Sequence, residues 1–214
     1  MHGLPSLPPD VPWPMREGYG ALTHLASIDC AALPTEALDI DLPEDGTLVF
    51  FRYSFADVNR DADDTAEPPY YSSGRGTDPD AGMKLLYVPA SATTAPRPAP
   101  KGSSVAEAGP LHLTAIYTSC LSWERTERDY LTDKDDEERC SDLAYAFDEC
   151  QERSRNQIGG HERPIQGDLH SEEERWTLLA SFYDLNDDVW TYWLIQPEHL
   201  AQRRFDEVFY VYQC

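Results

Sequence analysis

The clearest pattern along the chain is a series of apolar runs with the alternation and β-branched content of strands. Residues 21–29 alternate as a half-buried strand does, and residues 47–55 are dense in β-branched and aromatic side chains. Similar runs predict further strands over residues 84–88, 112–121, 176–184, 189–195 and 207–213. Pro197 suits the first position of a helix and predicts a short helix to about residue 204. The chain is therefore expected to consist mainly of β-structure.

A different periodicity appears in the middle of the chain, where residues 132–153 predict a helix. Thr132 and Asp135 resemble a capping box at its start. Apolar side chains then recur at steps of three and four residues, at Cys140, Leu143, Ala144, Phe147 and Cys150. The opposite face of this helix is strongly acidic. We expect its two cysteines to pack as small apolar side chains, a role favoured over that of a metal ligand or nucleophile.

Two similar hexapeptides bear on the architecture. Thr23–Ile28 and Thr177–Phe182 share Thr, Leu, Ala and Ser at equivalent positions, and each precedes an Asp-rich turn and an aromatic strand. The repeat is either a coincidence or the sign of two similar halves, about 1–88 and 111–214, which we favour. Residues 89–110 between them are rich in Pro, Ala and Ser, and they predict a surface loop that is either ordered or disordered. The expected fold class is α+β, a mostly antiparallel β-sheet with a few helices in a single domain over residues 1–214.

The charge of the chain narrows the possible partners. It has 17 Lys and Arg against 39 Asp and Glu, a formal net charge of −22. Binding to nucleic acid through the phosphate backbone needs a basic surface, which the sequence lacks, and anionic membranes are disfavoured for the same reason. A basic partner, a cation or solubility alone remain as explanations. Residues 57–80 (2 − 7 = −5) and 127–155 (5 − 11 = −6) carry half of the excess charge.

Composition predicts a folded protein without a membrane span. The chain is 41% hydrophobic and 11% aromatic, which is too rich in aromatic residues for a disordered acidic chain. No stretch approaches the roughly 20 apolar residues of a membrane span, and the N-terminal residues lack the pattern of a signal peptide. The five cysteines are odd in number and have no short-range pairing pattern, so we expect free thiols and a cytoplasmic location.

Motifs for metals and cofactors are weak or absent. Residues 57–63 place oxygens at alternate positions, as the first half of a calcium loop does, but Ala62 and Pro68 replace the expected glycine and glutamate. A solvated acidic loop is favoured there, with weak calcium binding as the alternative. The histidines lack the spacing of zinc hydrolases, and His24 and His112 lie in predicted strands, where packing is expected. Phosphate, dinucleotide and serine-nucleophile motifs are also absent, so no cofactor is expected.

Two segments present side chains suited to binding. Trp190, Tyr192 and Trp193 share one predicted strand, so aromatic rings must lie on both faces of its sheet. Burial of both faces explains this pattern, and a recognition surface is the alternative. In residues 159–168, glycines and a proline indicate a fixed bend that would present His161.

Both ends of the chain carry motifs of a known family. Residues 156–168 read Asn-Gln-Ile-Gly-Gly-His-Glu-Arg-Pro-Ile-Gln-Gly-Asp and precede the strand 176–184 and the stretch 205–214. The matching pieces near the N-terminus are residues 11–14, 25–29 and 42–48. In these pieces the chain resembles the YwqG-like family, a bacterial domain of unknown function. The resemblance does not extend to residues 57–150, and residues 185–190 depart from the turn usual in that family.

The resemblance implies a compact, mostly antiparallel α+β domain with two related halves, and it supplies no catalytic residues. Some relatives are thought to act beside secreted toxins as immunity proteins. By that analogy, the resemblance implies a protein-binding role.

Charge and resemblance together favour a non-enzymatic acidic binding module, most concretely an immunity protein or inhibitor of a basic toxin such as a nuclease. We expect its partner specificity in the acidic middle section and at the aromatic strand. The candidate contact residues are Asp135, Asp136, Glu137, Glu138 and Trp190.

An enzyme or small-ligand binder is the alternative. Its polar groups would come from one loop, as His161, Gln166 and Asp168, above a pocket between the two halves. A general scaffold without a dedicated ligand is the third possibility. The sequence indicates neither the identity of the partner nor the oligomeric state.

Overall fold

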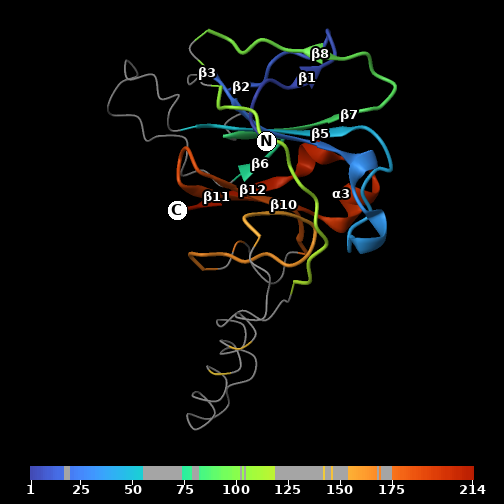
Figure 1. Cartoon of the computed structure of the whole chain (residues 1–214), viewed down its shortest axis with the longest axis vertical. Coiled ribbons are helices and arrows are strands. Elements are labelled where there is room, and N and C mark those ends of the chain that lie inside the picture. The colour runs from blue at the N-terminus through green and yellow to red at the C-terminus, as the bar shows by residue number, and fades with distance from the viewer. Residues whose placement is uncertain are drawn as a thin grey trace.

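Two antiparallel sheets stacked face to face form the centre of the molecule (Figure 1). The structure is a computed structural model, and it describes residues 1–16, 20–54, 74–78, 82–101, 103, 105–118, 142, 146, 154–167, 169 and 175–214. The expected α+β class, mostly antiparallel with few helices, is confirmed in this part of the chain.

The first sheet has three strands in the order β4-β5-β7. They are β4 (Thr23–Asp29), β5 (Thr47–Arg52) and β7 (Met83–Val88), and both pairings are antiparallel. The central strand β5 is buried at every residue after Thr47. Burial on both faces explains why its sequence is a continuous apolar run rather than an alternating one.

The second sheet has five strands in the order β6-β12-β11-β10-β9. Its long members are β10 (Thr177–Asp184), β11 (Val189–Ile195) and β12 (Phe209–Gln213). Short strands lie at its two edges, β6 (Gly74–Arg75) and β9 (Asn156–Ile158). The turn between β10 and β11 contains Asp188 at φ 56°, a left-handed conformation that Asp tolerates better than most residues.

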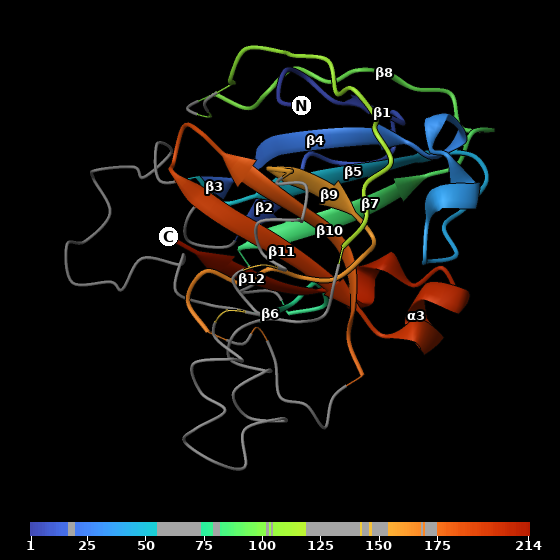
Figure 2. The same ribbon diagram turned by 60° about the horizontal axis from the view of Figure 1, so that its bottom comes forward.

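The core lies between the two sheets and centres on Phe50 of β5. Its ring centroid is 5.0 Å from that of Phe182 on β10 and 5.0 Å from that of Trp193 on β11, in edge-to-face contacts. Figure 2 shows the long strands of the two sheets lying across one another. Apolar residues of both sheets form one continuous cluster here, so the two sheets fold as one unit.

A further layer covers the outer face of the three-stranded sheet. It contains the pairs β1 (Ser6–Leu7) with β8 (Ala95–Pro96) and β2 (Met15–Arg16) with β3 (Gly20–Ala21). Leu7 and Trp13 from this layer pack against Phe51 of β5. Arg97 donates hydrogen bonds to the carbonyls of Pro8 and Val11. The described residues of the predicted loop 89–110 are thus tied to the N-terminal segment.

Short helices close one end of the sandwich (Figure 1). They are η1 (Cys30–Ala32), η2 (Thr35–Ala37), α3 (Pro197–Ala201) and η6 (Phe205–Glu207). Leu200 and Phe205 are buried in the central cluster from this end. The helix predicted from Pro197 is shorter than expected, because Arg203 adopts a left-handed φ of 59° that ends it.

The strands predicted around residues 21–29, 47–55, 84–88, 176–184, 189–195 and 207–213 are present, with ends shifted by a few residues. The strand predicted over residues 112–121 is wrong for its described part, because residues 112–118 pair with no strand. Their alternating sequence lies along a cavity wall instead. Most of the predicted helix 132–153 lies outside the described residues, and the two described residues within it, Asp142 and Ala146, are helical.

The two similar hexapeptides share an irregularity of the backbone. The pairing of β4 with β5 shifts between His24 and Ala26, and the pairing of β10 with β11 shifts between Leu178 and Ala180. A β-bulge therefore falls at the same place in both hexapeptides, and each begins an antiparallel run of three neighbouring strands. The wider division into two similar halves stays a prediction.

A buried ion cluster joins the two sheets at the end of β5. The Arg52 guanidinium donates to the carboxylates of Asp184, at the end of β10, and Asp187, in the turn that follows. All three side chains are 2% exposed. Arg52 also donates to the carbonyl of Tyr53 at 2.6 Å, and Ser54 donates to Asp187 at 2.8 Å.

The N-terminal segment completes this cluster, because Nε2 of His2 lies 3.5 Å from the Asp184 carboxylate. Burial by itself raises the pKa of Asp184, but the contacts with His2 and Arg52 outweigh it and hold that pKa well below its usual range. Asp184 is therefore ionised at neutral pH, and the cluster contains two buried carboxylates for one guanidinium.

Substitution Arg52→Met is expected to lower the free energy of unfolding by about 3–5 kcal/mol, because it leaves two carboxylates buried without their cation. Urea unfolding at neutral pH measures the loss. Arg155→Met is the matched control, since Arg155 is exposed and lies 5.2 Å over the Tyr183 ring, a contact worth about 1 kcal/mol or less. Equal losses in the two variants would contradict a stabilising role for the cluster.

His24 is a buried, neutral histidine, as its place in a predicted strand indicated. One ring nitrogen lies 3.1 Å from the carbonyl oxygen of Gly3 and the other lies 2.9 Å from the hydroxyl of Ser27. Desolvation lowers the pKa of His24 to about 4. The folded state thus binds this proton less readily than the unfolded state does.

We expect His24 to lower the free energy of unfolding by on the order of 3 kcal/mol as the pH falls from about 6.5 to about 4, and to leave it unchanged above that range. Urea unfolding at several pH values, compared between wild type and His24→Asn, isolates this term. His161→Asn serves as the control, because His161 is exposed. The prediction fails if His24→Asn and His161→Asn show the same pH dependence.

Candidate functional site

Residues 29–45, from the last residue of β4 to the approach to β5, form an acidic loop on the surface. Leu33, Ile40 and Leu42 fix it to the central cluster and are at most 9% exposed. The Asp29 carboxylate accepts a hydrogen bond from the amide of Ala31 at 3.1 Å and caps η1. With its apolar residues anchored inside, the loop presents its charged residues to solvent.

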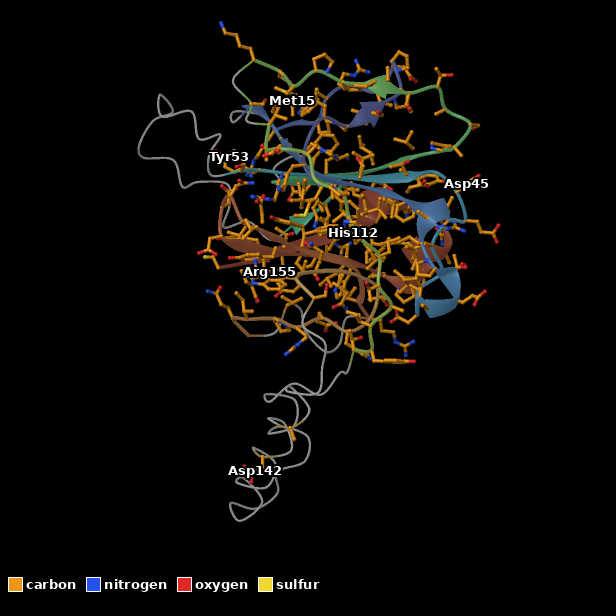
Figure 3. All side chains as sticks on the ribbon, in the orientation of Figure 1. Met15, Asp45, Tyr53, His112, Asp142 and Arg155 are labelled. Carbon is orange, nitrogen blue, oxygen red and sulfur yellow. The ribbon has the colours of Figure 1, made fainter. Side chains whose placement is uncertain are left out.

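Six exposed carboxylates gather on this loop: Asp29, Glu36, Asp39, Asp41, Glu44 and Asp45. The sequence has no Lys or Arg between Arg16 and Arg52. Among the described residues, none of the six carboxylates forms an ion pair with a basic side chain. Figure 3 shows Asp45 at the end of the sandwich away from Arg155 and Tyr53. Among the described residues, no ion pair therefore balances the negative charge of this acidic loop.

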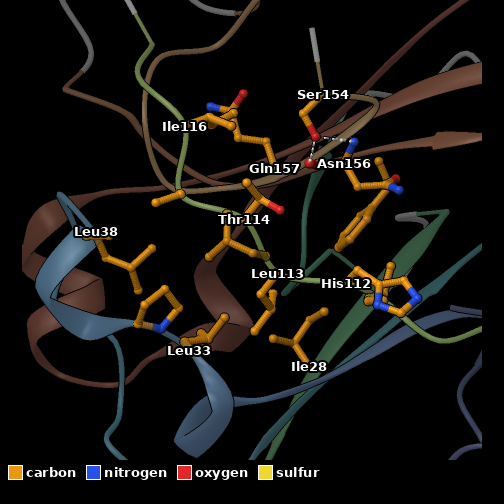
Figure 4. A pocket seen from close by; sticks show the side chains of 16 residues that line it. Ile28, Leu33, Leu38, His112, Leu113, Thr114, Ile116, Ser154, Asn156 and Gln157 are labelled. Carbon is orange, nitrogen blue, oxygen red and sulfur yellow. Dashed lines mark hydrogen bonds between the residues drawn. The ribbon is translucent and has the colours of Figure 1, made fainter. Parts of the chain in front are cut away.

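A cavity of about 210 Å³ lies beside the acidic loop (Figure 4). Leu33, Pro34, Ala37 and Leu38 of that loop form one wall, and residues 111–116 form the wall opposite. Ile28, Ile158 and Phe182 add apolar surface from β4, β9 and β10. The cavity thus brings together segments that are far apart in the sequence.

Polar groups occupy part of the cavity lining. They come from His112 and Thr114 on one segment and from Ser154, Asn156 and Gln157 at the start of β9. The Ser154 hydroxyl is already bonded to the main chain of Asn156, and the Gln157 amide donates to the carbonyl of Gly159 at 2.7 Å. His112 is exposed, which corrects the expectation that it packs within a strand.

The glycine bend that follows β9 is fastened to the acidic loop. The amide of Gly160 donates to the Asp39 carboxylate at 2.7 Å, and the amide of His161 donates to the Thr118 hydroxyl at 3.0 Å. Gly159 and Gly160 have φ values of 65° and 76°, which favour glycine. A Cβ atom on Gly159 would lie 2.5 Å from an Asp39 oxygen. The bend therefore has a clear structural role.

The loop residues predicted to bind a ligand do not converge in the described part of the chain. The His161 side chain is exposed. Gln166 donates its side-chain amide to the carbonyl of Cys214, and Gln213 accepts hydrogen bonds from the amides of Ile165 and Gln166 at 2.6 and 3.1 Å. Asp168 lies outside the described residues. The polar groups seen here attach the loop to β12.

Aromatic side chains of β11 lie on both faces of the sheet, as predicted. Trp193 is fully buried in the core, whereas Trp190 and Tyr192 lie on the outer face. Trp190 is half-buried, and its ring centroid is 5.2 Å from that of Tyr183. The neighbouring Leu185 is 72% exposed. Trp190 thus remains accessible enough to contact a partner.

The acidic residues predicted as partner contacts, Asp135, Asp136, Glu137 and Glu138, lie outside the described residues, as does the calcium-like segment 57–63. In the described ranges, no group of three or more His, Cys, Asp or Glu residues is arranged to hold a metal ion. Desolvation raises the pKa of the buried Cys30 thiol to about 11, which keeps it protonated and unreactive.

The contacts of Asp39, Thr118 and Gln213 were not found by sequence reasoning. Each joins segments 43 to 121 residues apart, and nothing in the local sequence distinguishes these side chains from other surface polar residues. The pair of glycines at 159 and 160 was the available signal. It indicated that the chain bends there, but it did not indicate which residues the bend contacts.

None of the helices that the structure describes has the length and apolar character needed to cross a membrane.

Gly159→Ala is expected to cost more stability than Gly167→Ala. Both positions have positive φ, 65° and 82°, so each alanine suffers about 1–2 kcal/mol of backbone strain. Only Gly159 lies against Asp39, whereas no atom lies within 4 Å of a Cβ on Gly167. Displacing Asp39 should cost about 1–3 kcal/mol more. Urea unfolding compares the two, and hydrogen exchange at the Gly160 amide should accelerate only in Gly159→Ala.

Comparison with known proteins gives a family and no activity. No protein with a curated description matches the chain. The family described as Domain of unknown function (DUF1963) matches residues 1–214, the whole length of the chain. This protein is therefore a member of the DUF1963 family.

Proposed function

We propose that this protein is a non-enzymatic binding module for a basic protein. The observation that carries the proposal is the acidic loop 29–45, whose six exposed carboxylates have no basic partner among the described residues. Mutual repulsion of such charges disfavours the free state slightly, and a cationic surface would relieve it. The loop rests on a buried apolar base, so it is presented without needing to fold on binding.

The net charge of −22 supports the same partner class. A strongly acidic protein attracts a cationic partner over a distance of about one Debye length, near 8–10 Å, and this raises the rate of association. The sequence-predicted contacts at Asp135, Asp136, Glu137, Glu138 and Trp190 would add to the surface that the acidic loop provides. They stay predictions.

A more specific form of the proposal is an immunity protein or inhibitor that occludes a basic toxin, such as a nuclease, in the cytoplasm. Its support is the resemblance of both ends of the chain to the YwqG-like family, which is itself a prediction. The alternative of an enzyme or ligand binder using His161, Gln166 and Asp168 has less support, because the Gln166 amide is engaged by the Cys214 main chain.

The test is affinity capture with the tagged full chain, from cells that express its neighbouring genes, followed by kinetics with the purified captured protein. We expect a basic partner whose association rate constant falls about tenfold between low and physiological ionic strength. Reversal to Lys of Asp135, Asp136, Glu137 and Glu138 should slow association. The matched control reverses four exposed carboxylates elsewhere, at Asp10, Glu107, Glu198 and Asp206.

A neutral or acidic partner, or an association rate that does not change with salt, would contradict the proposal. Equal effects of the two charge-reversed variants would support a role for overall charge and overturn the assignment to residues 135–138. For the inhibitor form, co-expression with a toxic captured protein should restore cell growth.

A further inference from the structure

The cavity beside the acidic loop is the right size for a single side chain. Its volume is about 210 Å³, and an apolar protein cavity of about 150 Å³ is large enough to hold benzene. An aromatic or branched aliphatic side chain therefore fits.

The floor of this cavity is already built. It is lined by Ile28, Leu33 and Phe182, which are 5%, 7% and 1% exposed. All three belong to the central core cluster. Side chains fixed in this way lose little freedom when a ligand enters, so the cost of ordering the site is low.

The mouth of the cavity exposes apolar groups to water. Leu113 is 48% exposed, and Pro34 and Ala37 on the opposite wall are also exposed. Figure 4 shows Leu33 and Leu38 on one side of the cavity and Leu113 and Thr114 on the other. A side chain that enters would contact apolar surface on both sides and cover the exposed part of Leu113.

The charge at the rim selects the kind of partner. Glu36 lies between the lining residues Pro34 and Ala37, and Asp39 follows the lining residue Leu38. The Asp39 carboxylate accepts a hydrogen bond from the amide of Gly160, two residues after the lining residue Ile158, so it joins the acidic loop to the β9 side of the cavity. A mainly apolar pocket with carboxylates beside it complements an apolar residue flanked by cations.

We infer that this cavity is the anchor site of the basic partner and receives one aromatic or branched aliphatic side chain that has Lys or Arg residues on either side. The inference rests on the proposed function and adds to it the residue type that the partner inserts. Buried anchors of this kind, surrounded by a polar rim, provide much of the affinity of protein interfaces.

Two short amidated peptides test the site. One is Lys-Arg-Lys-Gly-Phe-Gly-Lys-Arg-Lys, and the other has Gly in place of Phe. By fluorescence polarisation with the full chain, both peptides should bind, and added salt should weaken the binding of both. The Phe peptide should bind about tenfold more tightly than the Gly peptide. Only the Phe peptide should shift the NMR methyl signals of Leu38 and Leu113.

Variants of the chain distinguish the contribution of the anchor cavity to binding from that of the acidic side chains. Ala37→Trp fills the mouth and should remove the preference for Phe without changing the affinity for the Gly peptide. Leu113→Ser, at a half-exposed position that tolerates substitution, should reduce that preference too. The double variant Glu36→Gln with Asp41→Asn should weaken the binding of both peptides. The matched double variant Asp10→Asn with Glu107→Gln should weaken this binding less. Circular dichroism verifies that each variant is folded.

The outcomes distinguish this inference from the proposed function. Equal, salt-dependent binding of the two peptides, or a Phe preference that survives in both Ala37→Trp and Leu113→Ser, overturns the anchor site and leaves the acidic module in place. Failure of the wild-type chain to bind either peptide at low salt overturns both. Self-association of the chain that is lost in Ala37→Trp would make a second copy the occupant and overturn the inference.

Discussion

The buried cluster of Arg52, Asp184 and Asp187 is the constraint on which the arrangement of the two sheets depends. An ion taken out of water costs several kcal/mol unless it is paired and hydrogen-bonded, so these groups are tolerated only where all three meet. Arg52 ends the central strand of one sheet, Asp184 ends a strand of the other, and Asp187 lies in the turn that follows. Apolar packing around Phe50 brings the sheets together without regard to direction, whereas the ion cluster specifies how their ends align.

Alignment of the sheets also places the segments at the other end of the sandwich. The acidic loop follows β4, and the glycine bend follows β9, so their relative position is set by how the two sheets stack. The hydrogen bond from Gly160 to Asp39 joins them, and the cavity lies between β4, β9, the acidic loop and residues 111–116. The candidate binding surface is thus a consequence of the packing of the sheets and does not belong to any one motif.

Sequence reasoning succeeded where a local pattern has one structural meaning. The runs at 47–52 and 189–195 are strands because β-branched and aromatic side chains suit buried sheets. Pro197 begins a helix because its fixed φ and missing amide are harmless there. It failed at residues 112–118, whose alternation is that of a strand but which find no pairing partner. A strand needs a neighbouring strand to bond with, and the local sequence does not indicate whether one will be adjacent.

For the candidate site, the sequence by itself determined the excess of negative charge, the absence of basic residues between Arg16 and Arg52, and the bend at the two glycines. Those are properties of composition and of single-residue conformation. Only the tertiary structure decided that Asp39 accepts a hydrogen bond from the glycine bend and that the Gln166 side chain donates to the main chain of Cys214. It also decided that a mainly apolar cavity lies beside the acidic loop. These contacts join segments far apart in the chain, and packing of the two sheets is what brings them within reach.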